Sequence, residues 1–225
     1  MKKIIIVFYF IILACSCNQN TNKVQLDQLS PLDKLKLGNQ RFAKGAPIHP
    51  DETLQRIREL KKGQHPFAVV VSCSDSRIPP ELIFDQGLGD IFTIRTAGNV
   101  IGDYELGSIE YAVEHLHCNL VIVLGHENCG AIEAFISSNN ERHEDHIQNI
   151  VDYISNEDEE KAILDSLKTN PDLAIHANIN HGVTTLQNST PILKHLVEDK
   201  HLTVIGAYYD LDTGKVTFKD KIESN

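Results

Sequence analysis

The sequence predicts an α/β fold: a central, mostly parallel sheet, with four parallel strands plus an antiparallel edge strand, flanked by helices. Short apolar runs rich in β-branched residues recur along the chain, as is typical of buried parallel strands. Segments with helical spacing of apolar residues separate these runs, and such alternation gives parallel strands joined by right-handed crossovers. Asp212-Thr213-Gly214 is a turn signal near the end of the chain, so 208–218 is expected to be a hairpin into the edge strand.

The four parallel strands are expected at 67–71, 91–95, 120–124 and 202–207. Helices are expected at 32–42, 54–60, 107–117, from 129 onward, 174–186 and 191–197. Pro79-Pro80 ends any preceding helix and starts a further element. Between 137 and 169 the chain is acidic and polar, and only the spacing of Ile147, Ile150, Val151 and Ile154 indicates a helix.

Length and charge limit the classes of protein that this chain can represent. With 225 residues, 41% of them hydrophobic, the chain has room for one sizeable domain, which we place at 31–225. A formal charge of −10 argues against a nucleic-acid partner, since phosphate binding needs clustered Lys and Arg.

The first residues have the features of an export signal. Lys2-Lys3 precedes the apolar residues 4–13, and Ile12-Leu13-Ala14-Cys15 is similar to a bacterial lipoprotein cleavage box. Ten apolar residues are too few for a membrane-spanning helix. We therefore expect a signal peptide at 1–14, acylation of Cys15, a polar tether at 15–30 and an exported, membrane-anchored lipoprotein. An ordinary cleaved signal or a short anchor is the alternative.

Three potential metal ligands follow two of the predicted strands. Cys73 follows the strand at 67–71, and His126 and Cys129 follow the strand at 120–124. The carboxyl ends of parallel strands lie at one edge of a sheet, where sites are commonly built. Two thiols and one imidazole suit zinc and leave a fourth position open, as in catalytic sites. A Cys73–Cys129 disulfide is the alternative, because an exported protein can form one.

At these residues the chain resembles the β-class carbonic anhydrases. The resemblance covers about 32–219 and rests on five blocks that occur in order. The blocks are Lys36-Leu37-Gly38-Asn39-Gln40-Arg41-Phe42, Cys73-Ser74-Asp75-Ser76-Arg77, Arg95-Thr96-Ala97-Gly98-Asn99, Gly107-Ser108-Ile109-Glu110-Tyr111-Ala112 and Gly125-His126 with Cys129-Gly130-Ala131. The resemblance implies one Zn²⁺ per subunit, a homodimer or higher homo-oligomer, and reversible hydration of CO2 to bicarbonate and a proton.

Asp75 and Arg77 are the candidate catalytic residues. We expect an ionised Asp75 to accept a hydrogen bond from zinc-bound water and so orient the hydroxide, while Arg77 holds the carboxylate and keeps its pKa low. The resemblance also allows a closed state in which Asp75 becomes the fourth zinc ligand. The family's regulated members have Trp where this chain has Val70, so we expect the open form. A purely structural ion pair is the alternative.

The resemblance further implies an apolar substrate pocket of Gln64, Phe92, Ala97 and Tyr111, with some walls from a neighbouring subunit. Two other functions stay open: hydrolysis of CS2 or COS on the same scaffold, and a zinc-binding surface lipoprotein without turnover. A thiol redox protein is disfavoured, because the chain has no Cys-x-x-Cys pair. The group from His143 to His146 is expected to be a solvated helix face.

Overall fold

The computed structural model describes residues 28–138, 144–156, 158–161, 170 and 172–219. Two units are distinguished in the chain, Met1–Lys34 and Leu35–Asn225. The predicted signal peptide, Cys15 and nearly all of the predicted tether lie outside the described residues, so those expectations stay predictions. In the first unit, the Ser30 hydroxyl accepts the backbone N–H of Asp33 at 3.1 Å, just before helix α2 (Pro31–Ala43).

One five-stranded sheet forms the centre of the second unit, in the order β2-β1-β3-β4-β5. Its strands are β1 (Ala68–Cys73), β2 (Ile91–Thr96), β3 (Leu120–His126), β4 (Thr203–Tyr209) and β5 (Val216–Phe218). The first four pair in parallel, and β5 pairs antiparallel with β4. The predicted fold class is therefore confirmed, including the antiparallel edge strand. Every residue of β1 and β3 is buried, as expected for apolar strands covered on both faces.

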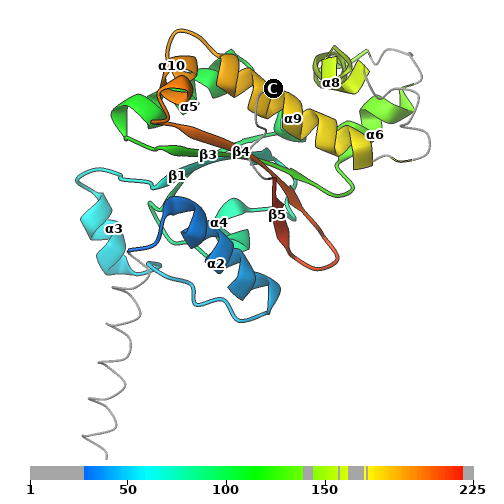
Figure 1. Ribbon diagram of the computed structural model, residues 1–225. Coiled ribbons are helices and arrows are strands. Elements are labelled where there is room, and N and C mark those ends of the chain that lie inside the picture. Colours follow the sequence, from blue (N-terminus) through cyan, green and yellow to red (C-terminus); the bar gives the residue numbers. More distant parts are fainter. Residues whose placement is uncertain (1–27, 139–143, 157, 162–169, 171, 220–225) are drawn as a thin grey trace, which may run out of the picture. The chain divides into compact units, whose positions relative to one another are not determined.

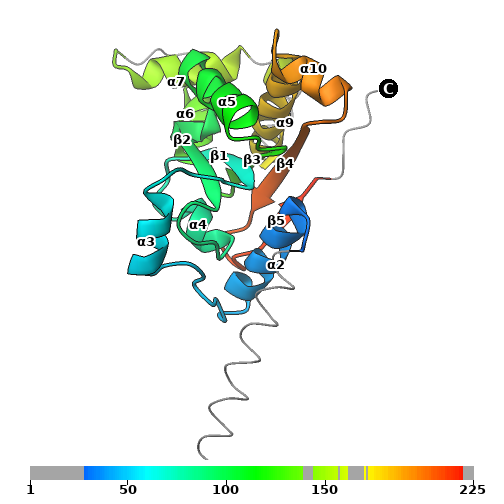
Figure 2. The same cartoon turned by 90° about the vertical axis from the view of Figure 1, so that its left-hand side faces the viewer.

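Helices cover both faces of the sheet (Figures 1 and 2). They are α3 (Leu54–Leu60), α4 (Pro80–Ile83), α5 (Asp103–His115), α6 (Gly130–Ser137), α7 (Ile147–Ser155), α8 (Asp158–Lys161), α9 (Asp172–Asn188) and α10 (Leu193–Glu198), besides α2 and the 3-10 turn η1 (Ala97–Asn99). In both views α5, α9 and α10 lie on one side of the sheet, and α3 and α4 on the other. No helix among the described residues is long and apolar enough to cross a membrane.

Helix α9 lies very close to β3 and β4. A Cβ atom added at Gly125 would come within 2.6 Å of the Ile179 side chain, and one added at Gly206 within 2.7 Å of it. Both strands therefore need glycine where Ile179, which is itself fully buried, packs against them. This contact fixes α9 beside the carboxyl ends of the strands, where the metal ligands are expected.

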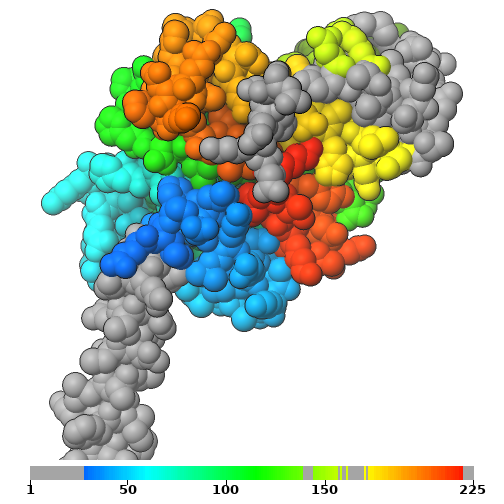
Figure 3. All heavy atoms as spheres, viewed as in Figure 1, coloured from blue at the N-terminus to red at the C-terminus, as the bar shows by residue number. Residues whose placement is uncertain are grey.

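Asn39 and Arg41 of α2 make buried polar contacts with α4 and with the β4–β5 hairpin. Asn39 donates from Nδ2 to the carbonyl oxygens of Ile83 (3.2 Å) and Gly214 (2.9 Å), and it accepts from the backbone N–H of Val216 (2.8 Å). Atoms of α2 and of the hairpin between β4 and β5 accordingly lie side by side on the surface in Figure 3. The carboxylate of Asp85 is completely buried and pairs with Arg41. These contacts join α2 to α4 and to the hairpin.

The main difference from the predicted elements is the start of α5. The sequence predicts a helix at 107–117, whereas α5 begins at Asp103. The Glu105 carboxylate accepts the backbone N–H of Gly102 at 3.0 Å, and acidic residues in the first turn suit the positive end of the helix dipole. The apolar residues that placed this helix begin at Ile109, so they do not locate its first turn, where Asp103 and Tyr104 are exposed. The other predicted helices and strands are present, with ends shifted by a few residues.

Candidate metal centre

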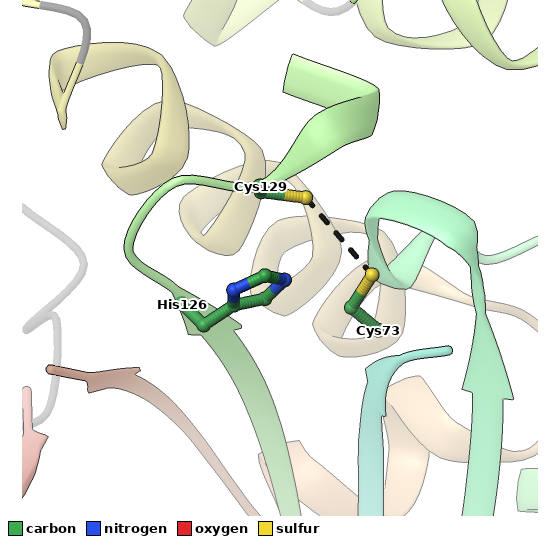
Figure 4. Close-up of side chains that lie close together, drawn as sticks. All are labelled: Cys73, His126 and Cys129. Atoms are coloured by element: carbon green, nitrogen blue, oxygen red, sulfur yellow. Dashed lines mark hydrogen bonds between the residues drawn. The ribbon is translucent and has the colours of Figure 1, made fainter. Parts of the chain in front are cut away.

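Three buried side chains converge where β1 and β3 end (Figure 4). Cys73 is the last residue of β1, His126 is the last residue of β3, and Cys129 immediately precedes α6. Because β1 and β3 are adjacent parallel strands, their carboxyl ends lie side by side. Asn128 has a positive φ of 51°, which turns the chain back between His126 and Cys129. The sequence therefore placed all three potential ligands at the correct edge of the sheet.

The spacing of the three ligand atoms fits a tetrahedral metal ion. All three lie within 4.8 Å of one another, and the two sulfur atoms are 4.0 Å apart. An ion about 2.3 Å from two sulfurs in tetrahedral geometry separates them by about 3.8 Å. Both cysteines are free thiols here, and the sulfur separation is about twice the length of a disulfide bond. The alternative of a Cys73–Cys129 disulfide is therefore wrong for this structure.

The ring of His126 is oriented for coordination through Nε2. Nδ1 lies 2.8 Å from the Glu127 carbonyl oxygen, which only accepts hydrogen bonds, so Nδ1 bears the ring proton. Nε2 is then a lone-pair donor, and it is buried without a hydrogen-bond partner. A buried unpaired nitrogen is costly unless it binds something. Residues 73, 126 and 129 therefore fit a zinc ion through an open imidazole nitrogen and two sulfurs.

Glu127 holds that orienting carbonyl in place. Its backbone N–H donates to the Tyr209 carbonyl oxygen (3.1 Å), and its carboxylate accepts the backbone N–H of Leu211 (3.1 Å). Hydrogen bonds of this kind fix the tautomer and direction of a ligating imidazole. The start of the β4–β5 hairpin thus contributes to the orientation of His126.

The two cysteines share their protons unequally. A hydrogen bond from the Cys129 thiol lowers the pKa of Cys73, and hydrogen bonds from backbone N–H groups lower it further, against the opposing effect of burial. The same contact raises the pKa of Cys129, and burial raises it further. The hydrogen bond between the two sulfurs therefore favours the thiolate form of Cys73 and the thiol form of Cys129. Zinc binds thiolates, so its binding would release the proton that remains on Cys129.

Asp75 and Arg77 form a two-point ion pair beside the three ligands. Arg77 donates from Nε and from its backbone N–H to Oδ1 of Asp75, both at 2.9 Å, and from Nη2 to Oδ2 at 2.7 Å. The Arg77 hydrogen bonds lower the pKa of Asp75 to about 2, so the carboxylate is ionised at neutral pH. Arg77 Nη2 also donates to the Asn128 carbonyl oxygen at 3.0 Å. The arginine therefore connects the segment after Cys73 to the turn between His126 and Cys129.

Sequence reasoning missed three residues that support the ligands. Arg95 donates to the carbonyl oxygens of Cys73 (3.1 Å) and Asp75 (2.6 Å). The backbone N–H of Gly98 donates to the sulfur of Cys73 at 3.2 Å, and buried Asn178 donates to the Gly98 carbonyl oxygen at 2.8 Å. Arg95 and Gly98 stand in a block that carries the family resemblance, which was the available signal. For Asn178, only a polar residue within an apolar helix pattern hinted at a role.

The proposed substrate pocket is not assembled within one chain. Phe92 and Tyr111 are neighbours, with ring centroids 6.4 Å apart, but Phe92 pairs in register with Val69 near the start of β1. It is four residues from Thr96, the partner of Cys73, which is about 13 Å along the strand. Gln64 is exposed in the segment before β1, at the end opposite Cys73. Ala97 alone of the four begins η1 at the metal edge.

The acidic residues Glu144 and Asp145 lie just before the first turn of α7. His143 lies outside the described residues, and Glu144, Asp145 and His146 are exposed. The Asp145 carboxylate accepts the backbone N–H of Ile147 at 3.0 Å. Among the described residues, the single group that brings three potential metal ligands together is Cys73, His126 and Cys129.

Sequence comparison identifies relatives along most of the chain. The family described as carbonic anhydrase matches residues 68–216. Carbonic anhydrase 2 of Mycobacterium tuberculosis is 36% identical over 194 residues, which cover 84% of this chain and 91% of the relative. The carbonic anhydrase of Mycolicibacterium smegmatis is 39% identical over a segment of the same length and coverage.

Solved structures share the fold. The β-carbonic anhydrase CcaA has a TM-score of 0.67 and 28% identity, and the match covers 84% of this chain and 95% of CcaA. A match to tetrameric β-carbonic anhydrases of Sordaria macrospora has a TM-score of 0.66 and covers 94% of this chain and 98% of that one. Its sequence identity is 21%, so this match supports the fold alone.

Proposed function

The chain belongs to the β-carbonic anhydrase family and is an enzyme of that family, and we propose that it catalyses the zinc-dependent, reversible hydration of carbon dioxide to bicarbonate and a proton. The observation that carries this proposal is the convergence of Cys73, His126 and Cys129 with an unpaired Nε2 on the histidine. Three ligands leave a fourth tetrahedral position for water or substrate, which is typical of catalytic rather than structural zinc.

Zinc held by these residues would supply a Lewis acid that makes a water molecule a good nucleophile at neutral pH. Asp75 would accept a hydrogen bond from that water and so direct its lone pair toward the carbon of CO2, because an ionised carboxylate only accepts. Arg77 keeps Asp75 ionised and fixes both of its oxygens. While both oxygens are held in this way, Asp75 is restrained from turning to become a fourth ligand.

Stopped-flow measurement of CO2 hydration, with the zinc content determined on the same sample, tests the proposed reaction. We expect one zinc ion per chain and hydration that disappears when Cys73 or His126 is changed to Ala. CS2 is supplied to the same preparation in parallel. Turnover of CS2 without hydration of CO2 would replace the proposal with hydrolysis of CS2, and zinc binding without either activity would indicate a surface protein with no turnover.

We further propose that a second copy of the chain completes the pocket. Gln64, Phe92 and Tyr111 lie away from the ligands of their own chain, so they serve a metal site only if another copy brings them there. Strand β2 is an edge of the sheet, and the side chains of Leu54 and Ile57 on α3 are exposed, with relative exposures of 72% and 52%. Exposed apolar side chains beside a sheet edge favour association.

Light scattering after size-exclusion chromatography tests this association. We expect at least a dimer, and loss of both the dimer and hydration activity in a Leu54→Lys and Ile57→Lys double variant. The matched control changes Lys61 and Lys62, exposed residues just after α3, to Gln. An active monomer would contradict the shared pocket while leaving the proposed reaction intact.

We also propose that the protein is exported and held at a membrane by a lipid on Cys15. The leader sequence supports this: two lysines, ten apolar residues and a cleavage box that ends at Cys15. Incorporation of labelled palmitate in a bacterial host tests it, with Cys15→Ser as the variant that should lose the label and Cys17→Ser as the control. Unlabelled, uncleaved protein in the cytosolic fraction would refute the proposal.

A further inference from the structure

Asn178 reaches the metal centre through the backbone of one glycine. Its Nδ2 donates to the Gly98 carbonyl oxygen at 2.8 Å, and the Gly98 N–H donates to the Cys73 sulfur at 3.2 Å. All three residues are buried, with exposures of 3% for Asn178 and 6% for Cys73. We infer that Asn178 is a positioning residue of the metal centre. It holds the backbone of Gly98 so that the Gly98 N–H keeps its hydrogen bond to the Cys73 thiolate.

Gly98 needs an outside partner to keep this conformation. Its φ and ψ are 66° and 19°, in the left-handed region that glycine enters and leaves easily. A side chain is blocked there, because an added Cβ would lie 2.9 Å from the Cβ of Ala131 in α6. The N–H of Gly98 points to Cys73 and its carbonyl oxygen accepts from Asn178, so the two hydrogen bonds fix the peptide groups on both sides of this residue.

The hydrogen bond from Gly98 to the sulfur changes how much electron density the Cys73 thiolate donates to a bound metal ion. Two thiolates cancel most of the charge of a divalent ion, which weakens its ability to acidify water. An N–H that donates to one thiolate draws electron density away from the metal and restores part of that ability. Groups that orient ligands in this way typically change metal affinity or activity about 10-fold to 100-fold when they are removed.

Helix α9 contains a second asparagine, Asn180, two residues after Asn178, which serves as a matched control. Asn180 carries the same side chain, but its Oδ1 accepts from Lys219 Nζ at 2.8 Å. Asn178→Leu and Asn180→Leu therefore remove the same amide from the same helix. Only the first change breaks the path to Cys73.

Cobalt substitution provides a readout of the thiolates that does not depend on turnover. In the Co²⁺-loaded protein, we expect Asn178→Leu to move the sulfur-to-cobalt charge-transfer band to longer wavelength, because a thiolate that has lost a hydrogen bond gives up an electron more easily. We also expect about 10-fold weaker zinc binding. Asn180→Leu should leave the band and the zinc affinity at their original values. Equal bands and affinities in the two variants would overturn the inference.

If Asn178→Leu does not fold, Asn178→Ala replaces it, because it removes the amide without adding a bulky group. A measurement on the unaltered chain tests the first link directly. In protein loaded with ¹¹³Cd, a hydrogen bond to a ligating sulfur gives a scalar coupling between the metal and the amide proton, which we expect at Gly98. Absence of this coupling would overturn the inference.

The inference rests on the proposed metal centre, and the two fail in different ways. If folded wild-type protein binds neither cobalt nor cadmium at Cys73, His126 and Cys129, the proposed function fails. In the other case the metal binds and hydration proceeds, while Asn178→Leu leaves the charge-transfer band unchanged and the Gly98 amide proton shows no coupling to cadmium. Only the role of Asn178 then fails.

Discussion

Arg77 holds Asp75 by both carboxylate oxygens, with Nε 2.9 Å from Oδ1 and Nη2 2.7 Å from Oδ2. The same guanidinium donates to the Asn128 carbonyl oxygen, in the turn between His126 and Cys129. The residue that sets the charge state of the Asp75 carboxylate therefore also contacts the turn that joins two of the potential ligands.

Asp75→Asn should abolish most activity and leave the metal in place. The amide keeps the size of the side chain but has one acceptor oxygen in place of two, and it cannot carry the negative charge. Loss of a group that positions a reacting water molecule typically costs about 100-fold in rate. Stopped-flow hydration and zinc content are measured together, with Asp212→Asn in the exposed hairpin turn as the control. An unchanged rate in Asp75→Asn would leave the ion pair with a structural role only.

The metal-free protein should form a Cys73–Cys129 disulfide that the zinc-loaded protein resists. The two sulfurs are 4.0 Å apart, so a small movement brings them to the bonding distance of about 2.05 Å. A bound ion occupies both thiolates and blocks this reaction. Mass spectrometry of peptides after mild oxidation, with and without zinc, measures the bond. Equal oxidation of the two forms would argue against a shared ion.

Gly98→Ala should destabilise the fold more than Gly45→Ala. Both glycines have a φ of 66°, but a Cβ at Gly45 meets no atom within 4 Å, whereas one at Gly98 meets Ala131 at 2.9 Å. We expect about 1–2 kcal/mol from the left-handed backbone at Gly45, and a larger loss at Gly98. Urea unfolding of both variants at pH 7.5 gives the difference, which is the packing contribution. Equal losses would mean that Ala131 moves aside without cost.

Arg41→Leu should lower the free energy of unfolding by about 3–5 kcal/mol, because it leaves the completely buried Asp85 carboxylate without its cation. Two backbone N–H groups, those of Ile48 and His49, would still donate to that carboxylate. Arg58→Leu on the exposed surface of α3 is the control and should stay within about 0.5 kcal/mol of wild type. The free energies are measured by unfolding in guanidinium chloride. A small change in Arg41→Leu would mean that water takes the place of the Arg41 side chain beside Asp85.

Protonation of His176 should make the protein less stable as the pH falls. Burial lowers the pKa of His176 below its usual 6.5, with Lys219 adding to the effect. The unfolded chain then binds a proton more readily than the folded one, so stability is complete above pH 6.5 and is lost as the pH falls toward the folded value. His176→Phe, which keeps a ring beside Tyr208, should reduce the loss measured by urea unfolding at pH 7.5, 6.5 and 5.5.

His195→Phe is the control for that measurement, because His195 is largely exposed. A His176→Phe protein whose stability falls with pH as steeply as that of wild type would show that other groups cause the fall.

The sheet and the meeting of the three potential metal ligands were predictable because they depend on local signals. Continuous apolar runs are buried in β1 and β3, and the residues just after a run necessarily lie at the sheet edge. The supporting contacts were not predictable in the same way. Asn178 meets Gly98 across 80 positions of sequence, and Arg56, although it lies on the polar-looking helix α3, is half-buried and pairs with Asp90. Such contacts depend on how elements pack, and composition and periodicity do not encode packing.

The separation of the ligands along the chain determines when a metal can be captured. Cys73 ends β1, His126 ends β3 and Cys129 follows β3. These two strands become neighbours only when the chain between them, which includes β2 and α5, has formed its crossover. Contacts between distant segments form late, because the loop between them must first be closed. We therefore expect a newly made chain to bind its metal ion only after the sheet has assembled, so that metal loading would report completed folding.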